Sequence, residues 1–211
     1  MSYQFPNSVL MIFCKAPIPG QVKTRLTPSL TDEQATQIHI ELSEKTFSLA
    51  TEKKLCPVQI WCSPSIEHPF FVKTHSAWDV SLKTQQGTDL GQRMLYAFKC
   101  ALKQFDNAVI IGCDCPSLKH SDLEQAFIAL NTNHPITIAP AEDGGYVLIG
   151  LNRLEEQLFS DIPWGTSEVL SITKSRINAT RLDCLELQQQ YDIDTIEDLK
   201  RYQNQSKIFI S

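Results

Sequence analysis

The chain has 211 residues, of which 42% are hydrophobic and 20% charged, and its 24 carboxylates outnumber its 19 lysines and arginines to give a net charge of −5. This length suits one buried core, so we expect residues 1–211 to form a single domain, and the acidic balance argues against nucleic acid as a partner. Because no apolar run approaches the roughly 18 residues that span a bilayer and the N-terminus lacks a secretion signal, we expect a cytoplasmic protein without membrane insertion.

Strand and helix patterns alternate along the chain. Short apolar runs predict strands, and amphipathic runs that follow capping residues predict helices. The expected strands are 8–15, 57–63, 81–85, 107–114, 136–141, 146–151 and 181–188. The expected helices are 31–53, 89–105, 121–132 with Ser121 and Glu124 as its cap, 167–179, and a last one from Thr195. Residues 64–80 fit neither pattern.

This alternation predicts an α/β fold with a twisted, mostly parallel sheet and helices on both faces. The short link between the strands 136–141 and 146–151 favours an antiparallel pair, so the sheet should be mixed. Ligands of such sheets bind beyond the carboxyl ends of the strands. Chemically active residues follow three strand ends, in the 15–25 loop, at Asp114 and in the 142–145 turn. We therefore expect the site to lie where these segments meet.

The 15–25 loop, KAPIPGQVKTR, predicts an anion site. No acid precedes Asp32, Gly20 allows close backbone approach, and Lys23 and Arg25 can bind phosphate. A P-loop would need glycine where Val22 stands, and no G-x-G-x-x-G follows a strand. The alternative is a solvated loop with ordinary lysines.

Carboxylates cluster in three other segments, and each has a simpler explanation. Asp114 could bind Mg²⁺ beside phosphates or could cap the next turn. Asp192 and Asp194 precede the last helix and could serve only as caps. The acids of the 142–145 turn could belong to an ordinary hairpin. Trp164 could pack in the core or form a stacking surface for a sugar or base.

Seven cysteines lie mostly in apolar runs, which favours buried, reduced thiols. Cys113 and Cys115 are separated by one residue and lack a second pair, so zinc binding by this pair has little support. The five histidines show no metal or triad spacing, and we assign them no role.

Six motifs follow one another across roughly residues 8 to 200: KAPIPGQVKTRL, QGTDLGQRM, IIGCDCPSL, AEDGGYVLIGL, IPWGTSEVL and DIDTIEDL. As a set they resemble a bacterial family of glycosyltransferase-like proteins in the nucleotide-diphospho-sugar transferase superfamily. This family is similar to the guanylyltransferase that activates phospholactate and to the molybdopterin nucleotidyltransferases. The resemblance implies a single-domain, Rossmann-like GT-A fold, a nucleotide or nucleotide-sugar donor, and a small-molecule acceptor.

The resemblance also implies roles for individual residues. Those expected to bind the nucleotide are Lys15, Ala16, Gly20, Lys23, Arg25, Gln86, Leu90 and Gly91. Those expected to bind the sugar or acceptor are Glu142, Asp143, Gly144, Trp164 and Thr166. Asp114 and Asp194 are expected to hold Mg²⁺ or Mn²⁺. The expected catalytic residues are Lys23 and Arg25, which would neutralise developing charge, and Asp143, which would contact the acceptor or act as a base.

Two reactions and one non-catalytic role remain open. Many GT-A glycosyltransferases carry Asp-x-Asp at the metal strand, whereas here Pro116 occupies the third position, as in the nucleotidyltransferases. In glycosyl transfer, a nucleoside diphosphate would leave the anomeric carbon of a sugar. In nucleotidyl transfer, pyrophosphate would leave a nucleoside triphosphate. A module that binds nucleotides without turnover is the third alternative.

Overall fold

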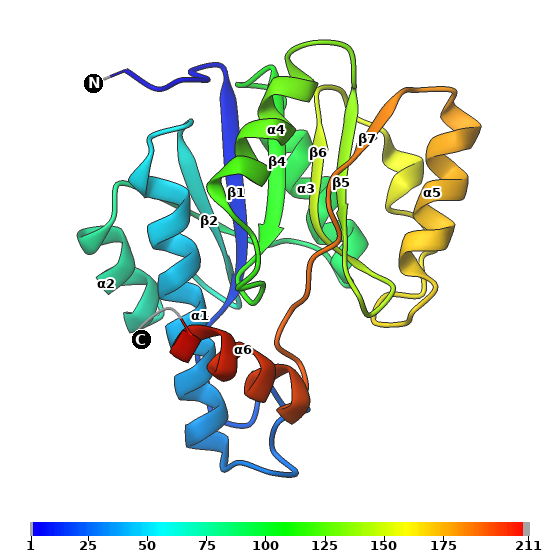
Figure 1. The fold of residues 1–211 in the computed structure, drawn as a ribbon. Coiled ribbons are helices and arrows are strands. Elements are labelled where there is room, and N and C mark those ends of the chain that lie inside the picture. The colour runs from blue at the N-terminus through cyan, green and yellow to red at the C-terminus, as the bar shows by residue number, and fades with distance from the viewer. Residues whose placement is uncertain (1, 209–211) are drawn as a thin grey trace.

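Strand β1 (Ser8–Lys15) lies in the interior of a mixed sheet (Figure 1). The computed structural model describes residues 2–208, and in this range seven strands form one sheet in the order β3-β2-β1-β4-β6-β5-β7. Strand β6 runs antiparallel to β4 and β5, whereas the other neighbours are parallel. The remaining strands are β2 (Val58–Ser63), β3 (Ser81–Thr84), β4 (Asn107–Gly112), β5 (Ile136–Pro140), β6 (Tyr146–Leu151) and β7 (Cys184–Glu186).

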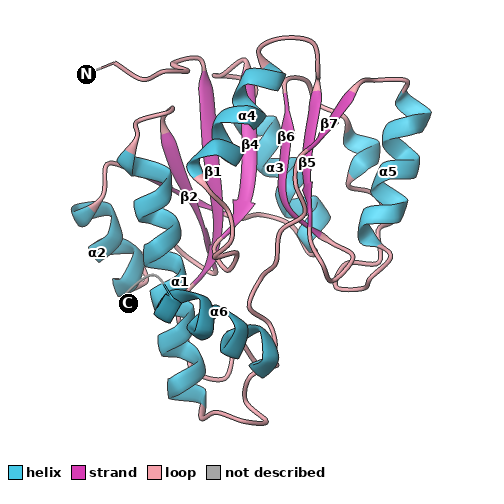
Figure 2. Ribbon diagram, viewed as in Figure 1, coloured by secondary structure: helices cyan, strands magenta, loops and turns pink. Residues whose placement is uncertain are grey.

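Helices cover both faces of this sheet, as Figure 2 shows. They are α1 (Asp32–Glu52), α2 (Pro69–Ala77), α3 (Leu90–Ala101), α4 (His120–Leu130), α5 (Val169–Thr180) and α6 (Ile196–Ile208), together with the short 3₁₀ helix η1 (Glu156–Leu158). Alternate residues of β1 pack into hydrophobic clusters on opposite faces of the sheet. Leu10 and Ile12 belong to the cluster that includes residues of α1, α2 and α4. Val9 and Met11 belong to the cluster that includes residues of α3 and α5. A strand buried on both faces must be apolar throughout, which explains the sequence SVLMIFC.

The order of the strands creates a crevice at the carboxyl ends of β1 and β4. Strands β2 and β3 lie on one side of β1, and β4 lies on the other. The loops that leave β1 and β4 therefore diverge at a topological switch point, where ligands of open α/β sheets bind. Helix α6 lies near this end of the sheet (Figure 1). Leu199 of α6 and Ile193, which precedes the helix, pack against Leu42 of α1.

The expected α/β fold and mixed sheet are confirmed, including the antiparallel pair β5–β6. The expected cap of α4 is wrong, because the carboxylate of Asp122 accepts the Lys119 N–H at 2.8 Å in place of a Ser121–Glu124 pair. Strand β7 covers only Cys184–Glu186, and Arg181, with a left-handed φ of 57°, ends α5 just before it. The unassigned 64–80 segment contains α2, which begins with Pro69 at its first position.

Among the described helices, none combines the length and apolar character needed to cross a membrane.

Candidate active site

Two adjoining cavities lie beyond the carboxyl ends of β1 and β4. The first, of about 440 Å³, includes the charged side chains of Lys15, Lys23, Arg25, Arg93, Asp114 and Asp194. The second, of about 250 Å³, is lined mainly by apolar side chains, among them Met94, Ile110, Tyr146, Val147, Ile149 and Trp164. Both are lined by Phe13, Leu90, Gly112 and Asp114. Asp114 thus lies where a polar and an apolar binding surface meet.

Lys23 lies at the centre of the charged groups in the first cavity. Its ammonium donates to Asp114 Oδ2 at 3.0 Å, to Asp194 Oδ1 at 3.2 Å and to the carbonyl oxygen of Ile193 at 2.6 Å. An ammonium has three N–H donors, so each donor has an acceptor here. Arg25 adds a further hydrogen bond, from Nη1 to Asp194 Oδ2 at 2.8 Å. The side chain of Lys23 is only 5% exposed, and its backbone has a left-handed φ of 50°.

These contacts shift the pKa values of Lys23 and Asp114. Burial disfavours the charged form of Lys23, but the carboxylates of Asp114 and Asp194 outweigh it and raise the pKa of the ammonium. Burial likewise opposes ionisation of Asp114, but the charge and hydrogen bond of Lys23 lower its pKa below the usual value. Asp114 is therefore ionised and Lys23 protonated at neutral pH.

A third carboxylate, Asp192, completes an acidic cluster. One carboxylate oxygen from each of Asp114, Asp192 and Asp194 can be chosen so that the three lie within 4.8 Å of one another. Burial and the charges of Asp114, Asp194 and Asp143 raise the pKa of Asp192 to about 7. Oxygen ligands of this kind are those that Mg²⁺ and Mn²⁺ prefer, so the donor set fits the metal that the resemblance implies.

Asp192→Asn is expected to make the metal-free protein more stable at high pH. The folded state raises the pKa of Asp192 from 3.8 to about 7, so it binds more protons than the unfolded chain between these values. Wild-type stability is therefore lost as the pH rises from about 4 to about 7, whereas the neutral amide avoids this loss. The full pKa shift corresponds to about 4 kcal/mol. Because Asp192 is only partly buried, solvent reduces this value, and we expect a difference on the order of 2 kcal/mol near pH 8 that vanishes near pH 4, measured by urea unfolding in chelator. If the free energy of unfolding of the two proteins depended on pH in the same way, the pKa of Asp192 would not be raised in the folded state.

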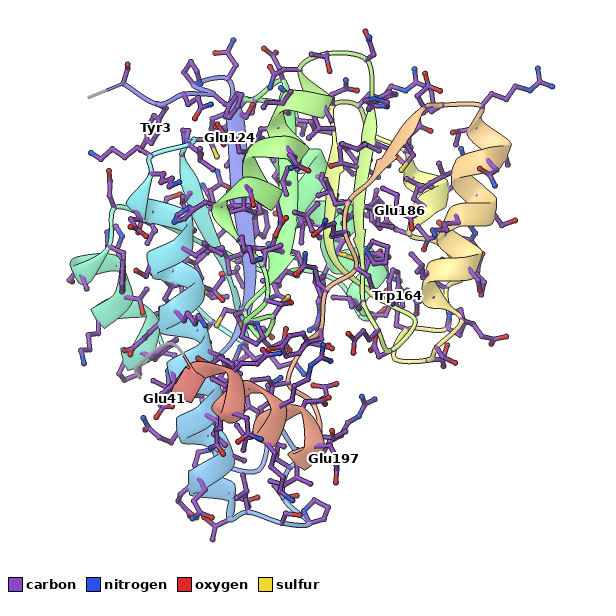
Figure 3. All side chains as sticks on the ribbon, in the orientation of Figure 1. Tyr3, Glu41, Glu124, Trp164, Glu186 and Glu197 are labelled. Atoms are coloured by element: carbon purple, nitrogen blue, oxygen red, sulfur yellow. The ribbon has the colours of Figure 1, made fainter. Side chains whose placement is uncertain are left out.

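The structure brings most of the predicted site residues to the two cavities. Lys15, Lys23, Arg25 and Asp194 line the first cavity, Leu90 and Asp114 line both, and Asp143, Trp164 and Thr166 line the second. In Figure 3, Trp164 lies between the lower ends of the strands and α5. The carboxylate of Asp143 accepts the Gly145 N–H at 2.8 Å, which holds its side chain in the turn.

Six predicted residues line neither cavity: Ala16, Gly20, Gln86, Gly91, Glu142 and Gly144. Gln86 lines a separate depression beside Trp61 and Tyr96, while its neighbour Gln85 lines the first cavity. Successive residues of an extended segment point to opposite sides, so a shift of one residue exchanges them. Glu142 pairs instead with Arg201, whose two nitrogens lie 2.7 and 3.1 Å from its carboxylate oxygens.

The small residues predicted to contact ligands shape the site through packing. A Cβ on Gly91 would come within 2.7 Å of Trp164 Nε1, so the glycine makes room for the indole. Gly144 has a φ of +89°, and a side chain there would overlap the backbone of Ser167. Gly20 turns the loop after β1 with a φ of +75°. Ala16 is buried, and its N–H donates to Ser63 O at 2.7 Å.

Other residues at the cavities were not predicted from the sequence. Asp192 joins Asp194 in the carboxylate cluster but was not predicted as a metal ligand. The spacing of the two residues could have indicated it, because side chains two residues apart in an extended segment point to the same side. Arg93 lies one helical turn after Leu90 on α3, so both can line one cavity. His39 lines the first cavity from α1, and no motif in the sequence indicates this.

Comparisons with known structures agree with this fold. A protein from Desulfovibrio desulfuricans G20, provisionally assigned as a nucleotide-diphospho-sugar transferase, is 28% identical with a TM-score of 0.81, over 90% of this chain and 84% of that one. The inositol-1-phosphate CTP transferase from T. maritima is 12% identical with a TM-score of 0.60, over 96% of each chain. CMP:2-keto-3-deoxy-manno-octonic acid synthetase, solved with CTP, is 12% identical with a TM-score of 0.59, over 95% of this chain and 98% of that one.

The sequence comparisons place the chain in a family. A search of curated protein sequences gives no significant match. Residues 46–166 match the profile of the family described as "Uncharacterized protein conserved in bacteria (DUF2064)". The chain has the fold of nucleotide-sugar transferases and cytidylyltransferases. Because the family match covers more than half of the chain, the chain belongs to the DUF2064 family.

Proposed function

We propose that this protein is a divalent-metal-dependent transferase that uses a nucleotide donor. The observation that carries the proposal is the position of Asp114, which lines both the charged cavity and the apolar cavity. A donor in the first cavity and an acceptor in the second would meet at this carboxylate. Holding two reactants in one geometry and stabilising charge between them is the main contribution that a protein makes to such transfers.

Nucleotidyl transfer is the reaction that the charges of the first cavity support best. Four cationic side chains line it, those of Lys15, Lys23, Arg25 and Arg93. A triphosphate carries more negative charge than a sugar diphosphate and gains more from this set. A nucleophilic oxygen of the acceptor would form a bond to the α-phosphorus, and where that oxygen belongs to a hydroxyl its proton would pass to Asp143. The bond from that phosphorus to the bridging oxygen would break, and pyrophosphate would leave with the electron pair.

Asp114, Asp192 and Asp194 are the residues that would hold Mg²⁺ or Mn²⁺. A bound divalent cation would neutralise charge on the phosphates. Lys23 donates to two of these carboxylates, at Asp114 Oδ2 and Asp194 Oδ1, so the ammonium and a metal would compete for the same ligands. With both carboxylates engaged elsewhere, Lys23 would keep its hydrogen bond to the Ile193 carbonyl and could also reach the phosphates beside Arg25.

The second cavity supports an acceptor with an apolar portion. Its walls include Met94, Ile110, Val147 and Trp164, and its carboxylates are Asp114, Asp143 and Asp192. Trp164 meets the ring of Tyr146 edge-on, with centroids 6.4 Å apart. Asp143, oriented by the Gly145 N–H, is the residue we assign to acceptor contact or proton removal.

Trp164→Ala is expected to raise the KM for the acceptor about tenfold with a smaller change in kcat, because about 1.4 kcal/mol of uniform binding would be lost. The measurement is steady-state kinetics with the acceptor varied at saturating donor. Trp164→Phe is the matched control, since it keeps an aromatic face in the apolar cavity. An unchanged KM for the alanine variant would remove Trp164 from the acceptor site.

Glycosyl transfer is the second candidate, supported by the 28% identity to the Desulfovibrio protein and by an aromatic side chain near the carboxylates. Two assays separate the reactions: pyrophosphate release from the four nucleoside triphosphates, and hydrolysis of a panel of nucleotide sugars. Both are run with Mg²⁺ and with chelator.

A thermal-shift screen of the same compounds comes first, because a ligand that binds the native state raises the apparent stability. No shift with any compound would contradict the nucleotide-donor proposal. A shift without turnover in either assay would support a module that only binds nucleotides.

A further inference from the structure

Three buried side chains outside the carboxylate cluster lie close together in the wall of the first cavity. They are Cys14 on β1, His39 on α1 and Cys113 just after β4, with exposed fractions of 1%, 4% and 6%. One ligand atom from each lies within 4.8 Å of the others. Strands β1 and β4 pair in parallel up to Phe13 and Gly112, so Cys14 and Cys113 follow at corresponding positions, and the helix supplies the histidine opposite them.

The surroundings of His39 match those of a metal-bound histidine. Its Nε2 lies 2.9 Å from the carbonyl oxygen of Lys15, which can only accept a hydrogen bond. Donation from Nε2 fixes the neutral tautomer and leaves Nδ1 unprotonated, so Nδ1 is the ring nitrogen that would bind the metal. Ser43 lies beside the same cluster: its hydroxyl donates to His39 O at 2.8 Å, and its oxygen is 3.6 Å from Cys14 Sγ.

We propose that Cys14, His39 and Cys113 form a binding site for a thiophilic divalent cation of the Zn²⁺ class. Two thiolates and an imidazole suit Zn²⁺, whereas Mg²⁺ takes oxygen ligands, so this site and the carboxylate cluster select different metals. On binding, each thiol would release one proton to solvent. Two thiolates then balance the charge of the cation, which limits the cost of burying it.

The first cavity gives the metal a route of access. Cys14, His39 and Cys113 all line it, so solvent can reach the site and a fourth ligand can come from the cavity side. The neighbours of the cluster in sequence, Lys15 and Asp114, belong to the proposed donor site. The inference does not depend on the proposed function, because it concerns metal binding by the protein alone.

Titration of the purified, chelator-treated full chain with Co²⁺ tests the proposal, because cobalt replaces zinc and reports its ligands by absorption. We expect thiolate-to-cobalt charge-transfer absorption that saturates at one equivalent and disappears when Zn²⁺ is added. Cys14→Ser and Cys113→Ser should each weaken Co²⁺ binding at least about tenfold. Two control variants should keep the absorption. Cys100→Ser removes a half-buried thiol on α3 outside the cluster, and Asp194→Asn alters the carboxylate cluster only.

The wild-type spectrum decides the question even if a serine variant fails to fold. Absence of charge-transfer absorption in the wild-type protein would overturn the proposal and leave hydrogen-bonded, reduced thiols. The same conclusion would follow if the Cys14→Ser/Cys113→Ser double variant, folded by circular dichroism, bound Co²⁺ with unchanged absorption.

Discussion

Asp114→Asn is expected to lower kcat/KM for the nucleotide-dependent reaction by at least about 100-fold. The amide keeps the shape of the side chain but removes the charge at the junction of the two cavities. Lys23 would keep its hydrogen bonds to Asp194 and to the Ile193 carbonyl, so we expect the variant to fold. The measurement is turnover as a function of Mg²⁺ concentration, with the activity lost at every concentration.

Asp106→Asn is the matched control for this variant. Asp106 is exposed and immediately precedes β4, at the opposite end of the strand from Asp114. Within residues 2–208, its carboxylate accepts a hydrogen bond from the side chain of Asn7 and from no other side chain. We expect its kinetics to match those of the wild type. A folded Asp114→Asn variant with wild-type kcat/KM would exclude Asp114 from the metal site and remove the main support for the proposed function.

Much of the fold follows from local patterns in the sequence. The run SVLMIFC predicts a strand buried on both faces, and the structure places it between β2 and β4. The short link at 142–145 predicts an antiparallel pair, which the register of β5 and β6 confirms. The position of the candidate site, near the carboxyl ends of β1 and β4, was predicted in the same way, because loops that follow parallel strands meet at one edge of the sheet.

The partners within the site could not be predicted, because they are distant in sequence. Lys23 lies 91 residues from Asp114 and 171 from Asp194, and no local pattern couples them. The sequence assigns cations to phosphates and carboxylates to metal, whereas the structure joins the two sets through Lys23 and Arg25. The proximity of Cys14, His39 and Cys113 could not be predicted for the same reason, since the three residues come from different segments of the sequence.

The sequence also does not show which of two neighbouring residues in a motif points toward a cavity. Gln85 lines the first cavity and Gln86 does not, although both fit the same motif. Glu142 and Asp143 are adjacent acids in one turn, and only Asp143 lines the second cavity, because Arg201 of α6 holds Glu142. Motifs thus locate a segment, but backbone direction decides which of its side chains face the ligand.

Lys23→Met is expected to lower the free energy of unfolding by about 2 kcal/mol in the absence of divalent cations. The side chain of Lys23 is 5% exposed, and those of its partners Asp114 and Asp194 are 37% and 31% exposed. Without the ammonium the two carboxylates repel each other. Losing one member of a fully buried pair costs about 3–5 kcal/mol, and the partial exposure of the carboxylates reduces this value. Urea unfolding in chelator measures the effect, with Lys53→Met, an exposed lysine after α1, as the control.

Adding Mg²⁺ to the Lys23→Met variant then separates two roles for this lysine. If the ammonium occupies the place of a metal between Asp114 and Asp194, its removal frees ligands, so Mg²⁺ should bind more tightly and stabilise the variant more than the wild type. Turnover should nevertheless fall, because the phosphates lose a cation. If Mg²⁺ stabilised both proteins equally, competition between Lys23 and the metal would be excluded. Lys23 would then be a structural partner of the two carboxylates, and phosphate binding would rest on Lys15, Arg25 and Arg93, the other cations that line the first cavity.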